Sequence, residues 1–242
     1  MGPTGYGGPV LKACLNGGRT RDSHPAVPLT PAELATATAA LAGVFAVHIH
    51  PRSADGIESL TASDIGPAVA AVRAVGLPVG VSTGLWIADQ DPDLRLRLVR
   101  EWGGLPPSAR PDFASVNVSE PGFSALVEVL RAADIGVEPG VWSVADASAI
   151  QGTTGWARVL VEIIGGSAET AVSRADDILA ALDAVGPVLL HGEEAACWPL
   201  VAHAAKLGLD TRIGLEDTLV GPNGEPVADN AELVRHALAI QP

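Results

Sequence analysis

The sequence is poor in cysteine, in aromatic residues and in basic residues. Only two of its 242 residues are cysteines, Cys14 and Cys197, and neither belongs to a C-x-x-C pair, so we expect buried free thiols and no disulfide framework. Lys and Arg number 15 against 28 Asp and Glu, which gives a formal net charge of −13. The arginines also occur singly, whereas a nucleic-acid surface needs clustered positive charge. We therefore expect no nucleic-acid partner.

Long hydrophobic runs are absent as well. No apolar stretch reaches the length that a membrane span requires. The first nine residues, Met1 to Pro9, are rich in Gly and Pro and lack the basic region and apolar core of a signal peptide. We therefore expect no membrane contact and a soluble, cytoplasmic protein.

What the sequence does contain is a repeated alternation of short apolar runs and helical patterns. Hydrophobic residues make up 48% of the chain, enough for one large core. The runs predict strands at residues 10–15, 44–50, 79–82, 113–118, 136–142, 158–164, 187–191 and 211–215. Helices are predicted at residues 30–41, 61–76, from 92 onward, 124–133, 144–150, 168–184, 195–206 and 229–239, the first with a capping box formed by Thr30 and Glu33.

Eight strand–helix pairs in this length predict an α/β fold of the (β/α)8 TIM-barrel type, with residues 1–242 forming one domain. A doubly wound open sheet would also alternate, but it usually carries a glycine-rich nucleotide loop after its first strand. Here that place holds Asn16-Gly17-Gly18, which is not a G-x-G-x-x-G motif. No linker or low-complexity segment divides the chain. One barrel is therefore the better interpretation.

Polar residues gather at the predicted carboxyl ends of these strands, where TIM barrels place their chemistry. They are Asn16, Arg19, His48, His50, Ser82, Thr83, Asn117, Ser119, Glu120, Glu138, Glu162, His191, Glu193, Arg212, Glu216 and Asp217. Many of them can be ordinary loop or capping residues. Glu162 interrupts an otherwise apolar strand, and we expect it to pair with an arginine inside the barrel.

Two histidines on one strand indicate half of a metal site. In a strand, alternate side chains share a face, so His48 and His50 point the same way. Neutral imidazoles suit zinc and similar divalent ions, although an H-x-H motif alone is weak and the two rings could instead cap the strand end and hydrogen-bond in the core. A catalytic ion needs a third protein ligand. Glu216 is our first choice and His191 its rival, with Asp217 available as a base.

Several motifs, in this order along the chain, resemble those of the β-keto acid cleavage enzyme family. They are Asn16-Gly17-Gly18, the 28–33 stretch, His48-Ile49-His50-Pro51-Arg52, Val81-Ser82-Thr83-Gly84 and Arg212-Ile213-Gly214-Leu215-Glu216-Asp217. The likeness spans nearly the whole chain, and the pairing of H-x-H with R-x-G-x-E-D is quite specific. It implies a zinc-dependent barrel that takes a β-keto acid and acetyl-CoA and yields acetoacetate and a new acyl-CoA.

The resemblance also implies roles for single residues. The family's zinc ligands match His48, His50 and Glu216, and the ion could be zinc or another divalent metal. Its catalytic aspartate matches Asp217 and the arginine that tunes it matches Arg212. The family serine that helps hold the substrate matches Ser82, and we place Thr83, Arg19 and Glu120 in the same substrate pocket. We expect a homo-oligomer, with no nucleic-acid or membrane partner.

The chain departs from the family's type member at positions that shape the pocket. Arg19 and Glu120 stand where the type member has a glutamate and a threonine, and residues 191–194 replace an aromatic, glycine-rich segment. Arg19 could meet a carboxylate on the substrate, or it could pair with Glu120 or Glu138. The rival functions are a metal-dependent aldolase or lyase that uses no CoA, and a metal-binding barrel without turnover. Keeping both Asp217 and Arg212 disfavours the last, because a metal store needs neither.

Overall fold

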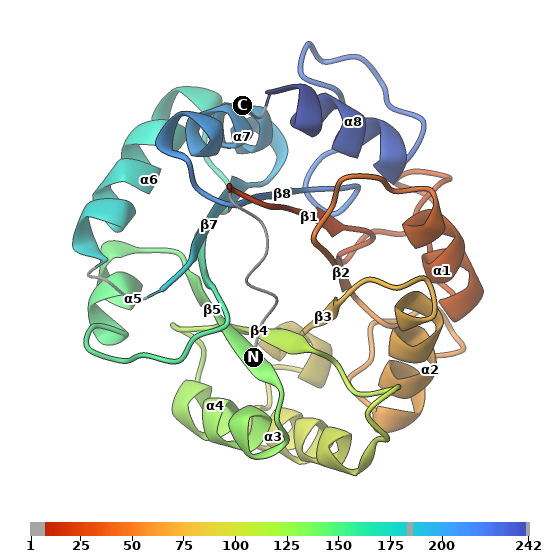
Figure 1. Cartoon of the computed structure of the whole chain (residues 1–242). Helices are drawn as coiled ribbons and strands as arrows, with labels where there is room; N and C mark the ends of the chain where they lie inside the picture. The colour runs from red at the N-terminus through yellow and green to blue at the C-terminus, as the bar shows by residue number, and fades with distance from the viewer. Residues whose placement is uncertain (1–7, 183–185, 241–242) are drawn as a thin grey trace.

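A computed structural model describes residues 8–182 and 186–240 of the chain. Most of the Met1–Pro9 stretch and the predicted end of the 168–184 helix lie outside these described residues. Within them, eight parallel strands alternate with eight α-helices, and the helices form a ring around the strands (Figure 1). The predicted (β/α)8 TIM barrel is confirmed.

The strands lie within two residues of the predicted bounds at either end. They are β1 (Leu11–Cys14), β2 (Ala46–Ile49), β3 (Val79–Ser82), β4 (Phe113–Asn117), β5 (Gly136–Val141), β6 (Val159–Ile163), β7 (Val188–Gly192) and β8 (Thr211–Ile213). The α-helices are α1 (Pro31–Ala39), α2 (Ala62–Arg73), α3 (Pro92–Arg100), α4 (Phe123–Ala132), α5 (Val144–Ala149), α6 (Ala168–Ala181), α7 (Cys197–Leu207) and α8 (Asn230–Ile240). Three short 3-10 helices flank α3 and α7: η1 (Leu85–Ala88) precedes α3, η2 (Glu101–Gly104) follows it, and η3 (Glu194–Ala196) precedes α7.

The strands hydrogen-bond in the order β7-β6-β5-β4-β3-β2-β1-β8. The ring closes between its two ends through Leu189 and Asp210, since Asp210 N donates to Val188 O (3.2 Å) and Leu190 N donates to Asp210 O (2.9 Å). All pairings along the sheet are parallel, so the carboxyl ends of the strands meet on one face of the barrel. This common face is what brings residues from distant parts of the sequence together.

Local sequence signals set the ends of the helices. At α1, Thr30 Oγ1 accepts a hydrogen bond from Glu33 N (3.3 Å), and the Glu33 carboxylate accepts one from Thr30 N (3.1 Å). This is the predicted capping box, with Pro31 in the first turn where its missing N–H costs nothing. At α3 the Asp91 carboxylate accepts from Asp93 N and Leu94 N in the same way.

A buried ionic network lies inside the barrel toward the amino ends of the strands. Lys12 Nζ lies 2.6 Å from Glu138 Oε2, and both side chains are completely buried. Arg158 joins them, with Nη1 3.5 Å from Glu138 Oε1 and Nε 2.7 Å from Asp210 Oδ2. Because every charge has a partner, the attraction between the partners offsets the cost of removing these groups from water. Glu138 is therefore neither a partner for Arg19 nor a free base at the mouth.

No helix in the described ranges has both the length and the apolar character to cross a membrane.

Candidate active site

A cavity of about 480 Å³ opens at the carboxyl ends of the strands. All eight strands or the loops that follow them contribute to its wall. It is lined by Gly17, Gly18, Arg19, His48, His50, Ser82, Trp86, Ser115, Asn117, Trp142, Glu162, Ile164, Glu193, Glu194, Arg212 and Glu216. The predicted metal ligands and part of the predicted substrate pocket thus share one cavity.

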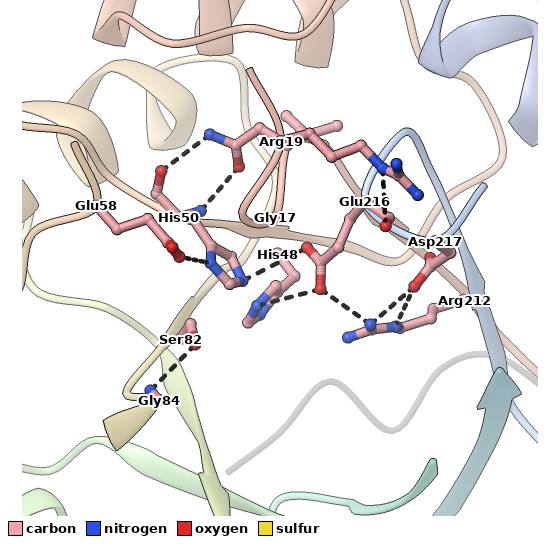
Figure 2. Close-up of polar contacts among 12 residues, drawn as sticks. Gly17, Arg19, His48, His50, Glu58, Ser82, Gly84, Arg212, Glu216 and Asp217 are labelled. Carbon is pink, nitrogen blue, oxygen red and sulfur yellow. Dashed lines mark hydrogen bonds and ion pairs between the residues drawn. The ribbon is translucent and has the colours of Figure 1, made fainter. Parts of the chain in front are cut away.

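His48, His50 and Glu216 converge on one side of this cavity (Figure 2). Nε2 of His48 lies 4.0 Å from Glu216 Oε1, and Nε2 of His50 lies 3.6 Å from Glu216 Oε2. The three ligand atoms all lie within 4.8 Å of one another. His191 is not in this group; the structure brings together the ligand set that we ranked first.

The loop after β1 holds this arrangement in place. Asn16 clamps the backbone of His50, donating from Nδ2 to His50 O (2.9 Å) and accepting at Oδ1 from His50 N (2.9 Å). Gly17 adopts a φ of +49° and packs so closely on Glu216 that a Cβ atom there would lie 2.5 Å from Glu216 Cγ. A glycine is therefore required for two independent reasons, its backbone conformation and the close approach.

The pKa values of the two histidines are shifted in opposite directions. Burial lowers the pKa of His48 well below its usual value, which keeps the imidazole neutral as a metal ligand must be. Burial acts on His50 as well, but Glu216 and Glu58 outweigh it and raise the pKa of His50 to about 9. Although burial opposes it, Arg212 and both histidines hold the pKa of Glu216 well below its usual value. Glu216 is thus ionised.

This donor set fits a divalent ion. Two imidazole nitrogens and a carboxylate are the ligands of many catalytic zinc sites, which keep a fourth position open. Ligands of a tetrahedral zinc ion lie about 2.0–2.1 Å from it and hence roughly 3.3 Å from one another. The separations of 3.6 and 4.0 Å are close to this, and Glu216 Oε2 is buried without a hydrogen-bond partner among the described residues.

Asp217 lies beside the triad and is bound by Arg212. Its Oδ1 accepts from Arg212 Nε (3.0 Å) and Nη2 (2.7 Å), while its Oδ2 is buried with no partner in the described part of the chain. Arg212 Nη2 also lies 2.9 Å from Glu216 Oε1. Burial, reinforced by Glu216 and Glu193 and opposed by Arg212, raises the pKa of Asp217 to about 8. Asp217 is fully buried, and Arg212 and Glu216 form the cavity wall next to it.

Glu162 does not pair with an arginine, so that expectation was wrong. Its Oε2 accepts a hydrogen bond from Trp142 Nε1 (3.0 Å), and its Oε1 lies 3.7 Å from His191 Nε2. Arg158 pairs with Glu138, and Arg212 pairs with Asp217. His191 is therefore the basic residue that lies beside Glu162. Burial and Arg212 lower the pKa of His191 to about 4, so its ring is neutral.

Two of the four residues predicted to hold the substrate line the cavity, and two do not. Ser82 and Arg19 line the cavity. Thr83 is fully buried and donates to Ser115 O (2.6 Å), and Glu120 pairs with Arg95 and accepts from Asn117 Nδ2 (2.9 Å). Neither Thr83 nor Glu120 belongs to the cavity wall, so their assignment to the substrate stays a prediction that the geometry does not favour.

Arg19 pairs with neither of the partners considered for it. Nη2 lies 2.5 Å from Glu194 Oε1, and Nε donates to Glu216 O (3.3 Å). The Arg19 side chain is 19% exposed and that of Glu194 is 64% exposed. Pairing with Glu120 or Glu138, which was the alternative to a substrate carboxylate, does not occur because each of those carboxylates already has a closer cation, Arg95 and Lys12.

Sequence reasoning missed three residues of the site. Glu58 contacts His50, while Trp86 and Trp142 line the cavity. Glu58 lies in the loop between β2 and α2, where an exposed glutamate is the ordinary expectation, so no sequence pattern marks it. The tryptophans follow strand ends, and that position was the signal that could have identified them.

Comparison with known proteins supports both the fold and a family. A family model described as beta-keto acid cleavage enzyme matches residues 9–241. No curated protein sequence matches the chain. Among solved structures, type I 3-dehydroquinate dehydratase from Clostridium difficile is similar over 98% of this chain and 93% of its own, with 11% identity and a TM-score of 0.65.

Two further structures are similar at the same level. Thiamine phosphate pyrophosphorylase from Pyrococcus furiosus aligns over 96% of each chain, with 12% identity and a TM-score of 0.55. Phospho-2-dehydro-3-deoxyheptonate aldolase from Thermotoga maritima aligns over 99% of this chain and 70% of its own, with 15% identity and a TM-score of 0.57. Because the sequence identities are only 11%, 12% and 15%, these structural similarities establish the barrel fold and nothing about function.

Proposed function

Because this chain belongs to the beta-keto acid cleavage enzyme family, we propose that its cavity binds one zinc or similar divalent ion and cleaves a β-keto acid with acetyl-CoA as co-substrate. The products are then acetoacetate and an acyl-CoA that carries the remainder of the keto acid. The observation that carries the proposal is the convergence of His48, His50 and Glu216 beside an Arg212-bound aspartate, Asp217.

The residues of the cavity divide the chemistry among themselves. A bound divalent ion would supply positive charge that polarises the β-keto oxygen and acidifies the carbon between ketone and carboxylate. Asp217 takes the proton from that carbon, and Oδ2 is the oxygen available for it because Arg212 occupies Oδ1. Ser82, in the cavity wall, helps to hold the substrate.

The bond changes that follow balance without any further reactant. The deprotonated carbon attacks the acetyl carbonyl of acetyl-CoA, and CoA leaves as a thiolate. The thiolate then attacks the original ketone carbon, and the bond between that carbon and the former nucleophile breaks. This step releases the new acyl-CoA, and Asp217 returns its proton to acetoacetate.

A pKa of about 8 suits Asp217 to this role. A carboxylate with an ordinary pKa near 4 is a weak base for a carbon acid, whereas a base whose pKa lies near the working pH is more effective. Burial causes most of the shift, and the paired guanidinium of Arg212 limits it. Arg212 therefore tunes the base as well as orienting it.

The test is turnover with defined components. Protein stripped of metal and reloaded with zinc is incubated with acetyl-CoA and a panel of β-keto acids, and acetoacetate is measured. Acetoacetate that requires both zinc and acetyl-CoA supports the proposal. Cleavage that proceeds without acetyl-CoA indicates an aldolase or lyase instead. If no β-keto acid in the panel is consumed by zinc-loaded protein, the proposal is rejected for those substrates.

We also propose that Arg19 selects keto acids with a carboxylate on the distal side chain. Its guanidinium lines the cavity, and its present partner Glu194 is mostly exposed, so a substrate carboxylate can replace it. A well-formed bidentate pair is worth about 1.5–3 kcal/mol.

The test compares anionic, neutral and cationic keto acids on wild type and Arg19→Ala. A preference for the anionic compound that disappears in the variant supports the idea. Equal losses for all three compounds reject it and leave Arg19 a structural partner of Glu194.

A further inference from the structure

We propose that Glu58 is a positioning residue for the metal centre, holding the ring of His50 so that its Nε2 faces the ion. The proposal rests on the function proposed above, because it assumes that His48, His50 and Glu216 bind a metal. Its subject is a residue outside that ligand set, contributed by the loop between β2 and α2.

The geometry around His50 carries the inference. Nδ1 of His50 lies 2.5 Å from Glu58 Oε1, while Nε2 on the far side of the ring lies 3.6 Å from Glu216 Oε2. Figure 2 shows Glu58 and Glu216 on opposite sides of the imidazole. A carboxylate that accepts a hydrogen bond from one ring nitrogen fixes the tautomer and leaves the lone pair of the other nitrogen for a metal. It also makes that nitrogen a stronger donor.

His48 provides a comparison within the same site. Its Nδ1 is buried and has no hydrogen-bond partner among the residues that the structure describes. Among the described residues, His50 therefore has a carboxylate on its Nδ1 side and His48 does not.

Glu58 is itself restrained from several directions, as a positioning group must be. Its Oε2 accepts a hydrogen bond from Trp86 Nε1 (3.1 Å) and lies 3.9 Å from Arg52 Nη1. The backbone of Glu58 forms an isolated antiparallel bridge with Arg52, and the side chain is only 14% exposed. Trp86 belongs to η1 after β3 and lines the cavity, so Glu58 connects the loops of two neighbouring strands.

The charge of Glu58 also favours a cation at the site. Among the three proposed ligands of a divalent ion, Glu216 alone carries a negative charge. Glu58 adds a second carboxylate against the far side of the His50 ring, although Arg52 lies 3.9 Å from it. Removal of Glu58 should thus weaken metal binding through both orientation and charge.

The experiment measures zinc dissociation constants by competition with a chelator. The variants are Glu58→Gln and Glu58→Ala, with two matched controls. Trp86→Phe removes only the tryptophan's bond to Glu58, and Glu162→Gln removes one carboxylate from the opposite wall of the cavity without touching His50. Thermal unfolding of each metal-free protein reports whether the fold is kept, and the visible absorption of bound Co²⁺ reports ligand geometry.

We expect Glu58→Gln and Glu58→Ala to weaken zinc binding about 10- to 100-fold and to shift the Co²⁺ bands. Glu162→Gln should bind zinc close to the wild-type constant. Trp86→Phe removes one restraint on Glu58 but leaves Arg52 and the backbone bridge, so it should weaken zinc binding less than either Glu58 variant. If the Glu58 variants are folded and bind zinc like wild type, the role of Glu58 is rejected while the metal site stands. If folded wild-type protein binds no divalent ion, the metal site and the role of Glu58 fail together. An affinity loss in Glu162→Gln equal to that in Glu58→Gln would also overturn the proposal, since cavity charge alone would explain it.

Discussion

Replacing Gly17 with alanine should weaken metal binding without a change in any metal ligand. A Cβ at position 17 would lie 2.5 Å from Cγ, 3.0 Å from Cβ and 3.3 Å from Cα of Glu216. Non-bonded carbon atoms rest about 3.5–4.0 Å apart, so the Glu216 side chain has to move by about 1 Å. Metal sites tolerate errors of only about 0.2 Å in ligand distance. We therefore expect Gly17→Ala to weaken zinc binding at least tenfold.

The same substitution should lower the free energy of unfolding. Gly17 has a φ of +49°, and a left-handed conformation costs a residue with a Cβ about 1–2 kcal/mol. In a chain of this size, each kcal/mol lowers the melting temperature by about 2–4 °C. The melting temperature of metal-free Gly17→Ala should therefore be lower than that of metal-free wild type by about 2–8 °C or more.

Gly18 provides the matched control for this prediction. A Cβ there would meet only Glu58 Oε2, at 3.6 Å, which is ordinary contact. Gly18→Ala should therefore bind zinc and melt like wild type. The assays are zinc affinity by chelator competition and thermal unfolding of the metal-free proteins. Wild-type zinc affinity in folded Gly17→Ala would refute the reasoning, and so would an equal loss in Gly18→Ala.

Three further predictions concern the ligands, the base and the buried histidine. Wild type should carry about one divalent ion per chain, and His48→Ala and His50→Ala should lose it while staying folded; unchanged metal content in both, by elemental analysis, would contradict the site. Asp217→Asn should lower turnover by roughly two to four orders of magnitude with metal content retained. Wild-type turnover should rise with pH as Asp217 loses its proton, with a midpoint below the value of about 8 that holds without the ion, because a nearby cation lowers the pKa of a carboxyl group. If most activity survives the substitution, the base lies elsewhere, with Glu193 in the cavity wall the next candidate. The pKa of His191 is about 4 in the folded protein and about 6.5 in the unfolded chain, so the unfolded chain takes up the proton first as the pH falls. Between pH 7 and pH 4, the free energy of unfolding should therefore fall by up to about 3 kcal/mol more in wild type than in His191→Gln, as measured by chemical denaturation. An equal fall in both proteins would show that His191 does not titrate in this way.

The sequence alone predicted the barrel, which is confirmed, and it ranked first the set of His48, His50 and Glu216, which the structure brings together. Strand and helix positions follow from local signals such as apolar runs, capping residues and glycines, which act over a few neighbouring residues. The common orientation of His48 and His50 follows from the two-residue period of a strand. The rule that parallel strands end on one face then places Glu216 of the last strand–loop segment near them.

Only the tertiary structure decided which partner each charged side chain takes. Glu162 was expected to meet an arginine and lies between Trp142 and His191. A substrate carboxylate, Glu120 and Glu138 were the alternatives considered for Arg19, and it pairs with Glu194. Glu58, which no pattern marked, lies against His50. These pairings join residues from different loops and depend on loop conformation and on which cation lies nearest. Differences of about 1 Å in loop position decide such contacts, because ion pairs and hydrogen bonds weaken steeply with distance, whereas the residue periods that define strands and helices do not depend on them.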